Sequence, residues 1–271
     1  MGPPSCYGGQ VHRSLLLPLL ACLGCKGVDD APSDIEGLLH FFWSEFDGEE
    51  DALAVGLDNL HVALGNKVLE DPLDGNMTSL KKGEISPLNM KREVDPSEAV
   101  GMFIASEFDC HVRDAVEIVT APNQEELYDI YDDYQRDFDG NRKAFLDEES
   151  AELGWTTVYT VSIPLSGQYT ATVLGSARWI EGADSGGFLI TRSHLPKAAE
   201  WDKDNPVFDQ DYRIEIYYSP KKGKVRHFEG LWRHMKTATI DTDDTNIQRF
   251  VLNGLADWDE QTAEWCAEGM P

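Results

Sequence analysis

The stretch Thr245–Trp265, TNIQRFVLNGLADWDEQTAEW, decides the fold that we expect for the whole chain. Large apolar side chains recur along it at helical spacing, which predicts one amphipathic helix; they are Ile247, Phe250, Val251, Leu255, Trp258 and Trp265. Thr245 and Gln248 have the spacing of a capping box, which marks the start of the helix. Burying about six such side chains contributes on the order of 10 kcal/mol gross, which an isolated helix cannot realise. The helix therefore needs a broad apolar partner.

The segment before this helix is rich in predicted strands and is the partner of the right size. Residues 155–164 alternate polar and apolar side chains, and a turn at Ser166-Gly167 leads into a second strand over 169–180. Further strands are predicted over 188–193 and 225–235. The strand over 212–219 alternates most clearly, so we expect one of its faces in the core and the other to be wet.

The first half of the chain gives a mainly helical pattern. Residues 33–48 and 49–64 each carry an apolar stripe, which predicts a helical hairpin with Gly65 as the second C-cap. Residues 66–94 predict a loop or linker, and Asp95-Pro96 is typical of the start of a short helix. A strand within 111–120, a helix from Asn123 and a helix over 142–153 follow.

The order of these elements from about His111 resembles the helix-grip fold of the START-like, or SRPBCC, superfamily. The resemblance implies an α+β fold, in which an N-terminal helical segment precedes a curved antiparallel sheet that grips the long C-terminal helix. It divides the chain into residues 1–25 as a leader, 26–107 as a linker and N-terminal helical region, and 108–271 as the START-like domain.

The resemblance also implies a cavity for a lipid or another hydrophobic small molecule between the sheet and the helix. The side chains that would face this interior are Tyr159, Val161, Ile214, Ile216, Phe250, Gly254 and Trp258. Gly254 would let the helix approach the sheet closely or leave room for a ligand. The alternative is that these side chains fill a solid core, because apolar stripes usually pack. The function would then be that of a structural or protein-interaction lipoprotein without a ligand.

Composition and motifs exclude several classes of function. With 49 acidic and 23 basic side chains, the formal net charge of −26 would repel a phosphate backbone, so we expect no nucleic-acid partner. No phosphate loop, metalloprotease motif or nucleophile elbow occurs, so we expect no cofactor, no metal, no catalytic residue and no enzymatic activity. The alternative hypothesis of an enzyme requires His194, His227 or His234 to meet a carboxylate, such as Glu215 or Glu229, inside a cavity.

The N-terminal 25 residues predict an exported lipoprotein of the bacterial cell envelope. His12 and Arg13 precede an apolar run that is too short to span a membrane, which is typical of a signal peptide. The end of the run resembles a lipobox, with Cys25 as the lipidated residue or, alternatively, Cys22. Acyl chains on that cysteine would anchor the protein to a membrane without a spanning helix. An unmodified apolar N-terminus is the competing interpretation.

Cys110 and Cys266 would share this oxidising compartment, in which disulfides persist. They either pair with one another or remain two free buried thiols.

Overall fold

The computed structural model describes residues 31–65, 69–88, 90–181 and 187–269. The chain has an α+β fold with one nine-stranded sheet and a long C-terminal helix, which confirms the fold class that the sequence predicts. The predicted signal peptide, including Cys22 and Cys25, lies outside the described residues. Among the described helices, none combines the length and the apolar character that crossing a bilayer requires.

The helices and strands follow one another in a mixed order along the chain. They are α1 (Ile35–Ser44), α2 (Glu50–Leu64), β1 (Leu73–Met77), α3 (Lys82–Ile85), η1 (Pro96–Glu98), β2 (Val100–Asp109), α4 (Val112–Val119), η2 (Gln124–Glu126), β3 (Asp133–Asp139), α5 (Arg142–Leu146), β4 (Glu152–Ile163), β5 (Gly167–Ile180), β6 (Phe188–His194), β7 (Glu200–Trp201), β8 (Val207–Tyr218), β9 (Lys224–Lys236) and α6 (Thr245–Glu268). The strand order is β1-β2-β9-β8-β6-β5-β4-β3, with β7 paired to β5, and neighbouring strands are antiparallel.

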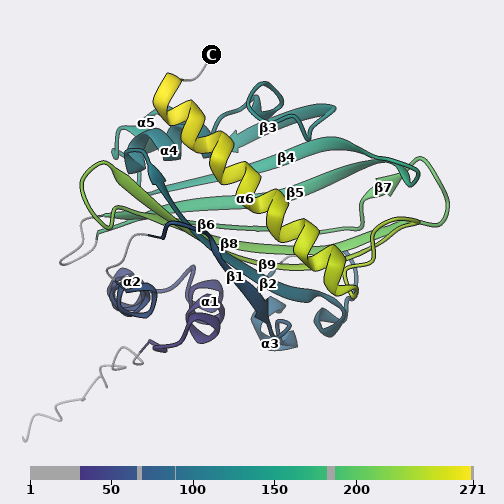
Figure 1. The fold of residues 1–271 in the computed structure, drawn as a ribbon, viewed down its shortest axis with the longest axis horizontal. Helices are drawn as coiled ribbons and strands as arrows, with labels where there is room; N and C mark the ends of the chain where they lie inside the picture. Colours follow the sequence, from purple (N-terminus) through teal and green to yellow (C-terminus); the bar gives the residue numbers. More distant parts are fainter. Residues whose placement is uncertain (1–30, 66–68, 89, 182–186, 270–271) are drawn as a thin grey trace, which may run out of the picture.

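Helix α6 crosses one face of this sheet, as Figure 1 shows in yellow. Its start is fixed by Asp244, whose side chain accepts a hydrogen bond from the Asn246 backbone, so the cap lies one residue before the predicted Thr245. Leu252 and Leu255 pack against residues of β2 and β9. The end of the helix is marked by Gly269, which has a positive φ of 84° that suits glycine.

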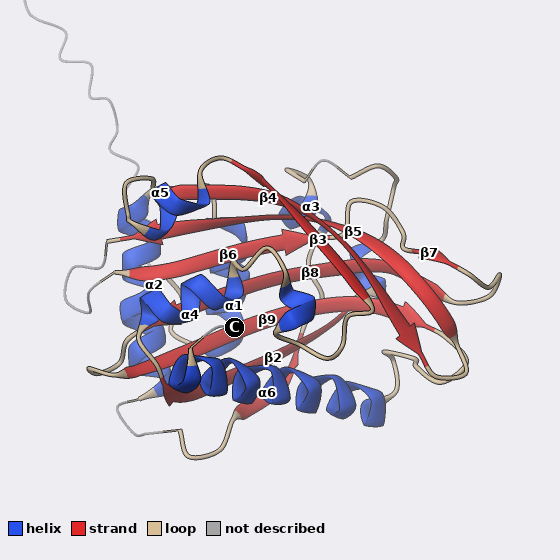
Figure 2. Ribbon diagram, turned by 90° about the horizontal axis from the view of Figure 1, so that it is seen from above, coloured by secondary structure: helices blue, strands red, loops and turns tan. Residues whose placement is uncertain are grey.

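Helices α1 and α2 form the predicted hairpin and cover the opposite face of the sheet. Asp34 caps α1 by accepting a hydrogen bond from Gly37, and Gly65 ends α2. Leu39, Phe42 and Trp43 of α1 are almost fully buried in one cluster with alternate residues of β8 and β9. Strands β2, β6, β8 and β9 are therefore largely buried on both faces, whereas β3 and β4 carry exposed residues. Figure 2 shows the twist of the sheet behind α4 and α6.

Five segments differ from the sequence prediction, one of them being the helix expected over 142–153, which ends at Leu146 and is followed by β4 from Glu152. The predicted loop contains β1, and the helix expected after Asp95 is the single turn η1 followed by strand β2. Strand β2 packs on both faces, so its sequence does not show the polar alternation that marks a half-buried strand. The sheet thus includes residues 100–107, which the prediction assigned to the N-terminal helical region.

The order of strand and helix after His111 is the reverse of the prediction. Residues 112–119 form helix α4, because Ala115, Val116 and Ile118 lie on a buried side while the charged residues between them are exposed. Tertiary packing here overrides the β propensity of valine and isoleucine. The helix expected from Asn123 is reduced to η2, and β3 follows it.

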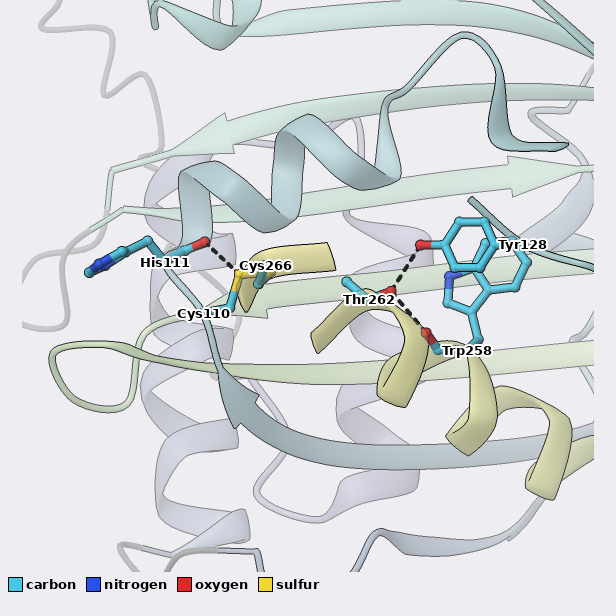
Figure 3. Close-up of a disulfide and its surroundings, with 6 residues drawn as sticks. All are labelled: Cys110, His111, Tyr128, Trp258, Thr262 and Cys266. Atoms are coloured by element: carbon cyan, nitrogen blue, oxygen red, sulfur yellow. Dashed lines mark hydrogen bonds between the residues drawn. A yellow bond between two sulfur atoms is a disulfide. The ribbon is translucent and has the colours of Figure 1, made fainter. Parts of the chain in front are cut away.

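A disulfide joins Cys110, between β2 and α4, to Cys266 in the last turn of α6. Figure 3 shows the bond beside the C-terminal end of the helix. The bond closes a loop between residues that are 156 positions apart in the sequence. It holds the end of α6 against the segment that joins β2 to α4.

Candidate functional site

A cavity of about 100 Å³ lies between α6, the segment after α4 and the inner face of the sheet, which is the face that α6 crosses; the outer face is the one that α1 and α2 cover. Its walls carry aromatic or aliphatic side chains from Val119, Tyr131, Tyr134, Trp155, Tyr159, Val173, Leu255 and Trp258. Its polar lining comes from Gln124, Arg136, Thr157, Thr191, Ser193, Asp211, Arg213, Glu215 and Glu229. The cavity therefore has an aromatic wall and a charged floor.

The aromatic wall is held together by ring contacts around Trp258 of α6. Tyr128 stacks on the Trp258 ring with centroids 3.6 Å apart, and its hydroxyl lies 2.9 Å from Thr262 Oγ1 (Figure 3). Tyr131 meets Trp258 edge-on at 5.9 Å and Tyr159 of β4 edge-on at 5.4 Å. Such pairs favour a flat or apolar molecule at the wall.

The charged floor comes from facing positions on β8 and β9. Glu215 lies directly opposite Glu229 in the register, and Tyr217 lies opposite His227. Carboxylates at directly opposed positions repel one another. The Glu215 carboxylate is stabilised by hydrogen bonds from the Thr191 hydroxyl at 2.6 Å and the Tyr217 hydroxyl at 3.0 Å.

His227 adjoins this floor and links it to α6. Its Nδ1 lies 2.7 Å from Asp259 Oδ1, its ring stacks on Tyr217 at 4.2 Å, and its Nε2 lies 3.6 Å from Glu215 Oε1. Burial disfavours the charged imidazole, but the charges and hydrogen bonds of Asp259 and Glu215 outweigh it and raise the pKa of His227 to about 10. The protonated imidazole in turn helps to hold the pKa of Glu215 below its usual value, against the effect of burial.

Glu229 is the least satisfied carboxyl group of the floor. The residue is 3% exposed, and its Oε1 has no hydrogen-bond partner among the described residues. The Arg213 Nη1 lies 3.5 Å away, outside hydrogen-bond distance. Burial raises the pKa of Glu229 to about 7, although Arg213 opposes the shift. Near neutral pH this group can accept a hydrogen bond, donate one or hold a cation.

Two of the seven residues predicted to line the interior do so: Tyr159 and Trp258. Val161 is buried in a neighbouring apolar cluster, away from the cavity lining. Ile214 and Ile216 were expected to face the helix and do not, because they pack under α1 on the other face of the sheet. The face of β8 expected to be wet is the one that lines the cavity.

Phe250 and Gly254 also lie elsewhere than expected. Phe250 is 65% exposed, and a Cβ added at Gly254 would meet nothing within 4 Å. The buried face of α6 instead includes Gln248, Asp259 and Thr262. These polar side chains bond to other parts of the fold, so hydrophobic periodicity misses them and wrongly includes Phe250, although Leu255 and Trp258 of the predicted stripe do face the sheet.

The three histidines named by the enzyme hypothesis have different surroundings. His234 Nδ1 lies 2.7 Å from Asp209 Oδ1, and neither residue lines the cavity. His194 has no hydrogen-bond partner at Nε2 among the described residues, and burial lowers its pKa to about 4. Among the three, His227 is the one that adjoins carboxylates of the cavity. Asp259 was missed because nothing in the sequence distinguishes it from the other acidic residues of α6.

Structural comparison finds solved proteins of similar general architecture at low identity. The human StarD13 (DLC2) lipid transfer and protein localization domain has a TM-score of 0.41 and 9% identity, covering 76% of this chain and 87% of that chain. Dicamba monooxygenase bound to 3,6-dichlorosalicylic acid has a TM-score of 0.35 and 12% identity, covering 62% and 46%. Protein NE0264 from Nitrosomonas europaea has a TM-score of 0.34 and 12% identity, covering 65% and 97%. No protein-family model and no curated protein matches the chain. None of these likenesses carries functional information for this chain.

Proposed function

We propose that this protein binds a small hydrophobic molecule with one polar end, without a chemical step. The observation that carries the proposal is the cavity beneath α6, which has aromatic rings on its wall and carboxylates on its floor. Ligand sites of this kind combine an apolar lining with a few convergent polar groups that fix the orientation. The apolar body would lie against Trp258 and Tyr159, and the polar end would meet the side of Glu229.

The size and charge of the cavity favour a small ring compound over an acyl lipid. An apolar cavity of about 150 Å³ holds one benzene molecule. The space here is about 100 Å³, so a ring with one polar substituent needs only a small displacement of side chains. An acyl chain would need α6 to move and would cover buried charges without giving them hydrogen bonds, which is costly.

A titration with two alcohols of different shape tests this proposal. We expect benzyl alcohol to bind the full chain and n-decanol not to bind, as measured by calorimetry and tryptophan fluorescence. Trp258→Leu removes one ring from the wall, so benzyl alcohol should bind about 2- to 10-fold more weakly, the equivalent of one aromatic pair of about 0.5–1.5 kcal/mol.

Gly254→Ala is the matched control, since it lies on the same helix and faces away from the sheet. It should leave the affinity for benzyl alcohol unchanged. Binding of decanol with no binding of benzyl alcohol would identify a lipid carrier instead. If neither alcohol binds, the cavity is not a ligand site, and the protein-interaction alternative gains support.

We further propose that the domain is held at a membrane of the bacterial envelope by acyl chains on Cys25 or Cys22. The apolar run and the small residues before each cysteine support this address. A disulfide between Cys110 and Cys266 suits an oxidising compartment. Growth with a labelled fatty acid should label the wild-type protein, and Cys25→Ser should abolish the label while Cys22→Ser keeps it. The reverse result would assign Cys22, and an unlabelled wild-type protein would end the proposal.

A further inference from the structure

We propose that Glu215, His227 and Glu229 form a binding site for a divalent transition-metal ion. This inference goes beyond the organic ligand proposed above and is tested without it. The three side chains offer one nitrogen and two carboxylate oxygens that all lie within 4.8 Å of one another. They come from two neighbouring strands, so no metal-ligand spacing exists in the sequence.

The ligand atoms have distances that one ion can bridge. His227 Nε2 and Glu215 Oε1 lie 3.6 Å apart, and both can lie roughly 2.0–2.2 Å from one Zn²⁺ in a tetrahedral arrangement. The two atoms that would bind most directly, His227 Nε2 and Glu229 Oε1, are both buried without a hydrogen-bond partner among the described residues. A buried polar atom with no partner needs an explanation, and a metal ion supplies one for both.

The surroundings orient the ligands as metal sites do. A metal-binding histidine usually donates its other ring N–H to a carboxylate, which fixes the tautomer and turns the free nitrogen toward the ion. Asp259 holds this position at 2.7 Å from His227 Nδ1, and Tyr217 fixes the ring plane by stacking. The hydroxyl of Thr191 holds Oε2 of Glu215, and Oε1, which accepts a hydrogen bond from the Tyr217 hydroxyl at 3.0 Å, lies 3.6 Å from His227 Nε2.

The charges around the site balance with a dication in place. Glu215 and Glu229 stand opposite one another on adjacent strands, so a cation between them relieves their repulsion. The ion would take the place of the imidazole proton on His227. Arg213 is the neighbouring cation that would repel the metal ion, since its Nη1 lies 3.5 Å from Glu229. The same guanidinium also pairs with Asp211, whose Oδ1 lies 3.4 Å from Arg213 Nε.

The donor set indicates the class of ion and leaves room for a further ligand. One imidazole and two carboxylates suit Zn²⁺, Mn²⁺ or Fe²⁺ better than Ca²⁺, which takes six to eight oxygens. Three protein ligands leave at least one position open, as in metal sites that bind a small molecule. Glu215 and Glu229 line the cavity, so that position faces the cavity space.

The test is a calorimetric titration of Zn²⁺ into the full chain after treatment with EDTA, with the disulfide intact. We expect the wild type to bind one equivalent tightly, and Glu229→Gln to weaken that site by at least about a hundredfold. Asp259→Asn should weaken it by about 10- to 100-fold, the usual effect of losing the carboxylate behind a histidine ligand. Glu229→Gln and Asp259→Asn keep every histidine and every cysteine of the wild type, so these residues contribute the same background to all three proteins.

Two further variants separate a metal site from a general effect on folding. His234→Gln removes the pair that His234 of β9 forms with Asp209 of β8, and neither residue lines this cavity. This variant should leave the tight Zn²⁺ site unchanged. Arg213→Gln should tighten Zn²⁺ binding, because it removes the opposing charge while Asp211 keeps its 2.7 Å bond from Arg233. The proposal fails if wild type and Glu229→Gln bind Zn²⁺ with equal stoichiometry and affinity. Because no organic ligand is present, that failure is distinct from a failure of benzyl alcohol to bind.

Discussion

Replacing Cys110 and Cys266 together by alanine is expected to lower the free energy of unfolding by about 4–5 kcal/mol. The disulfide joins residues 156 positions apart, and in the chain-entropy model a closed loop of this length strongly restricts the unfolded chain. The loop contains most of the sheet, so its loss should be felt by the whole fold. In the native state α6 should also loosen at its C-terminal end, where Trp265 donates to the Leu127 carbonyl at 2.9 Å.

Urea unfolding of the oxidised wild type and the double variant measures this difference. The reduced wild type is the matched control, because it has the same contacts without the covalent link and should unfold close to the double variant. In the double variant, backbone hydrogen exchange should be faster in the last turns of α6 than in β8 or β9. Equal unfolding midpoints for the oxidised wild type and the variant would show that the bond contributes no stability.

Changing Arg226 to methionine is expected to cost about 3–5 kcal/mol of folding stability. Arg226 on β9 and Glu107 on β2 form an ion pair at 2.6 Å, and both side chains are almost fully buried. Arg226 also donates to the carbonyl of Gly65 at 3.0 Å, so it joins the end of α2 to the sheet. Removing the guanidinium leaves the Glu107 carboxylate buried with one exposed lysine as its remaining cation, and an uncompensated buried charge is strongly destabilising.

Two comparisons separate the cost of the uncompensated Glu107 charge from the loss of packing. Adding Glu107→Gln to Arg226→Met removes the uncompensated charge and should recover part of the lost stability. Arg113→Met breaks an ion pair with Glu148 whose side chains are largely exposed, and should change stability by less than about 1 kcal/mol. If Arg226→Met costs no more than Arg113→Met, the buried Arg226–Glu107 pair adds no more stability than an exposed pair.

The sequence predicts the elements that bury one face and expose the other. The long C-terminal helix, the hairpin of β4 and β5 and the helical hairpin of α1 and α2 follow from local periodicity. Strand β2 does not, because it is packed from both sides. Helix α4 does carry helical spacing, with Ala115 and Val116 buried and Arg113, Asp114 and Glu117 exposed, but the β-branched run Val116–Val119 favoured a strand in the prediction.

The candidate site was harder to predict than the fold because it depends on which face of each element meets which neighbour. The alternation of Ile214 and Glu215 separates two faces of β8 correctly, but the sequence does not say that α1 covers one and α6 the other. The polar face therefore looked like a solvent face, although Glu215 lines the cavity beneath α6. In the same way, Asp259 of α6 gave no sign that it meets His227 on a strand 32 residues earlier.

The helical hairpin on the outer face has a consequence for how this protein can change over time. Residues of α1 and α2 and of the strands beneath them, such as Trp43 and Trp232, form a tightly packed core that does not reach the cavity. That core can supply stability while the inner face keeps groups that favour binding at some cost to the fold. Mutations at Ser193, which lines the cavity, would then change its lining over generations while the outer core maintains the structure.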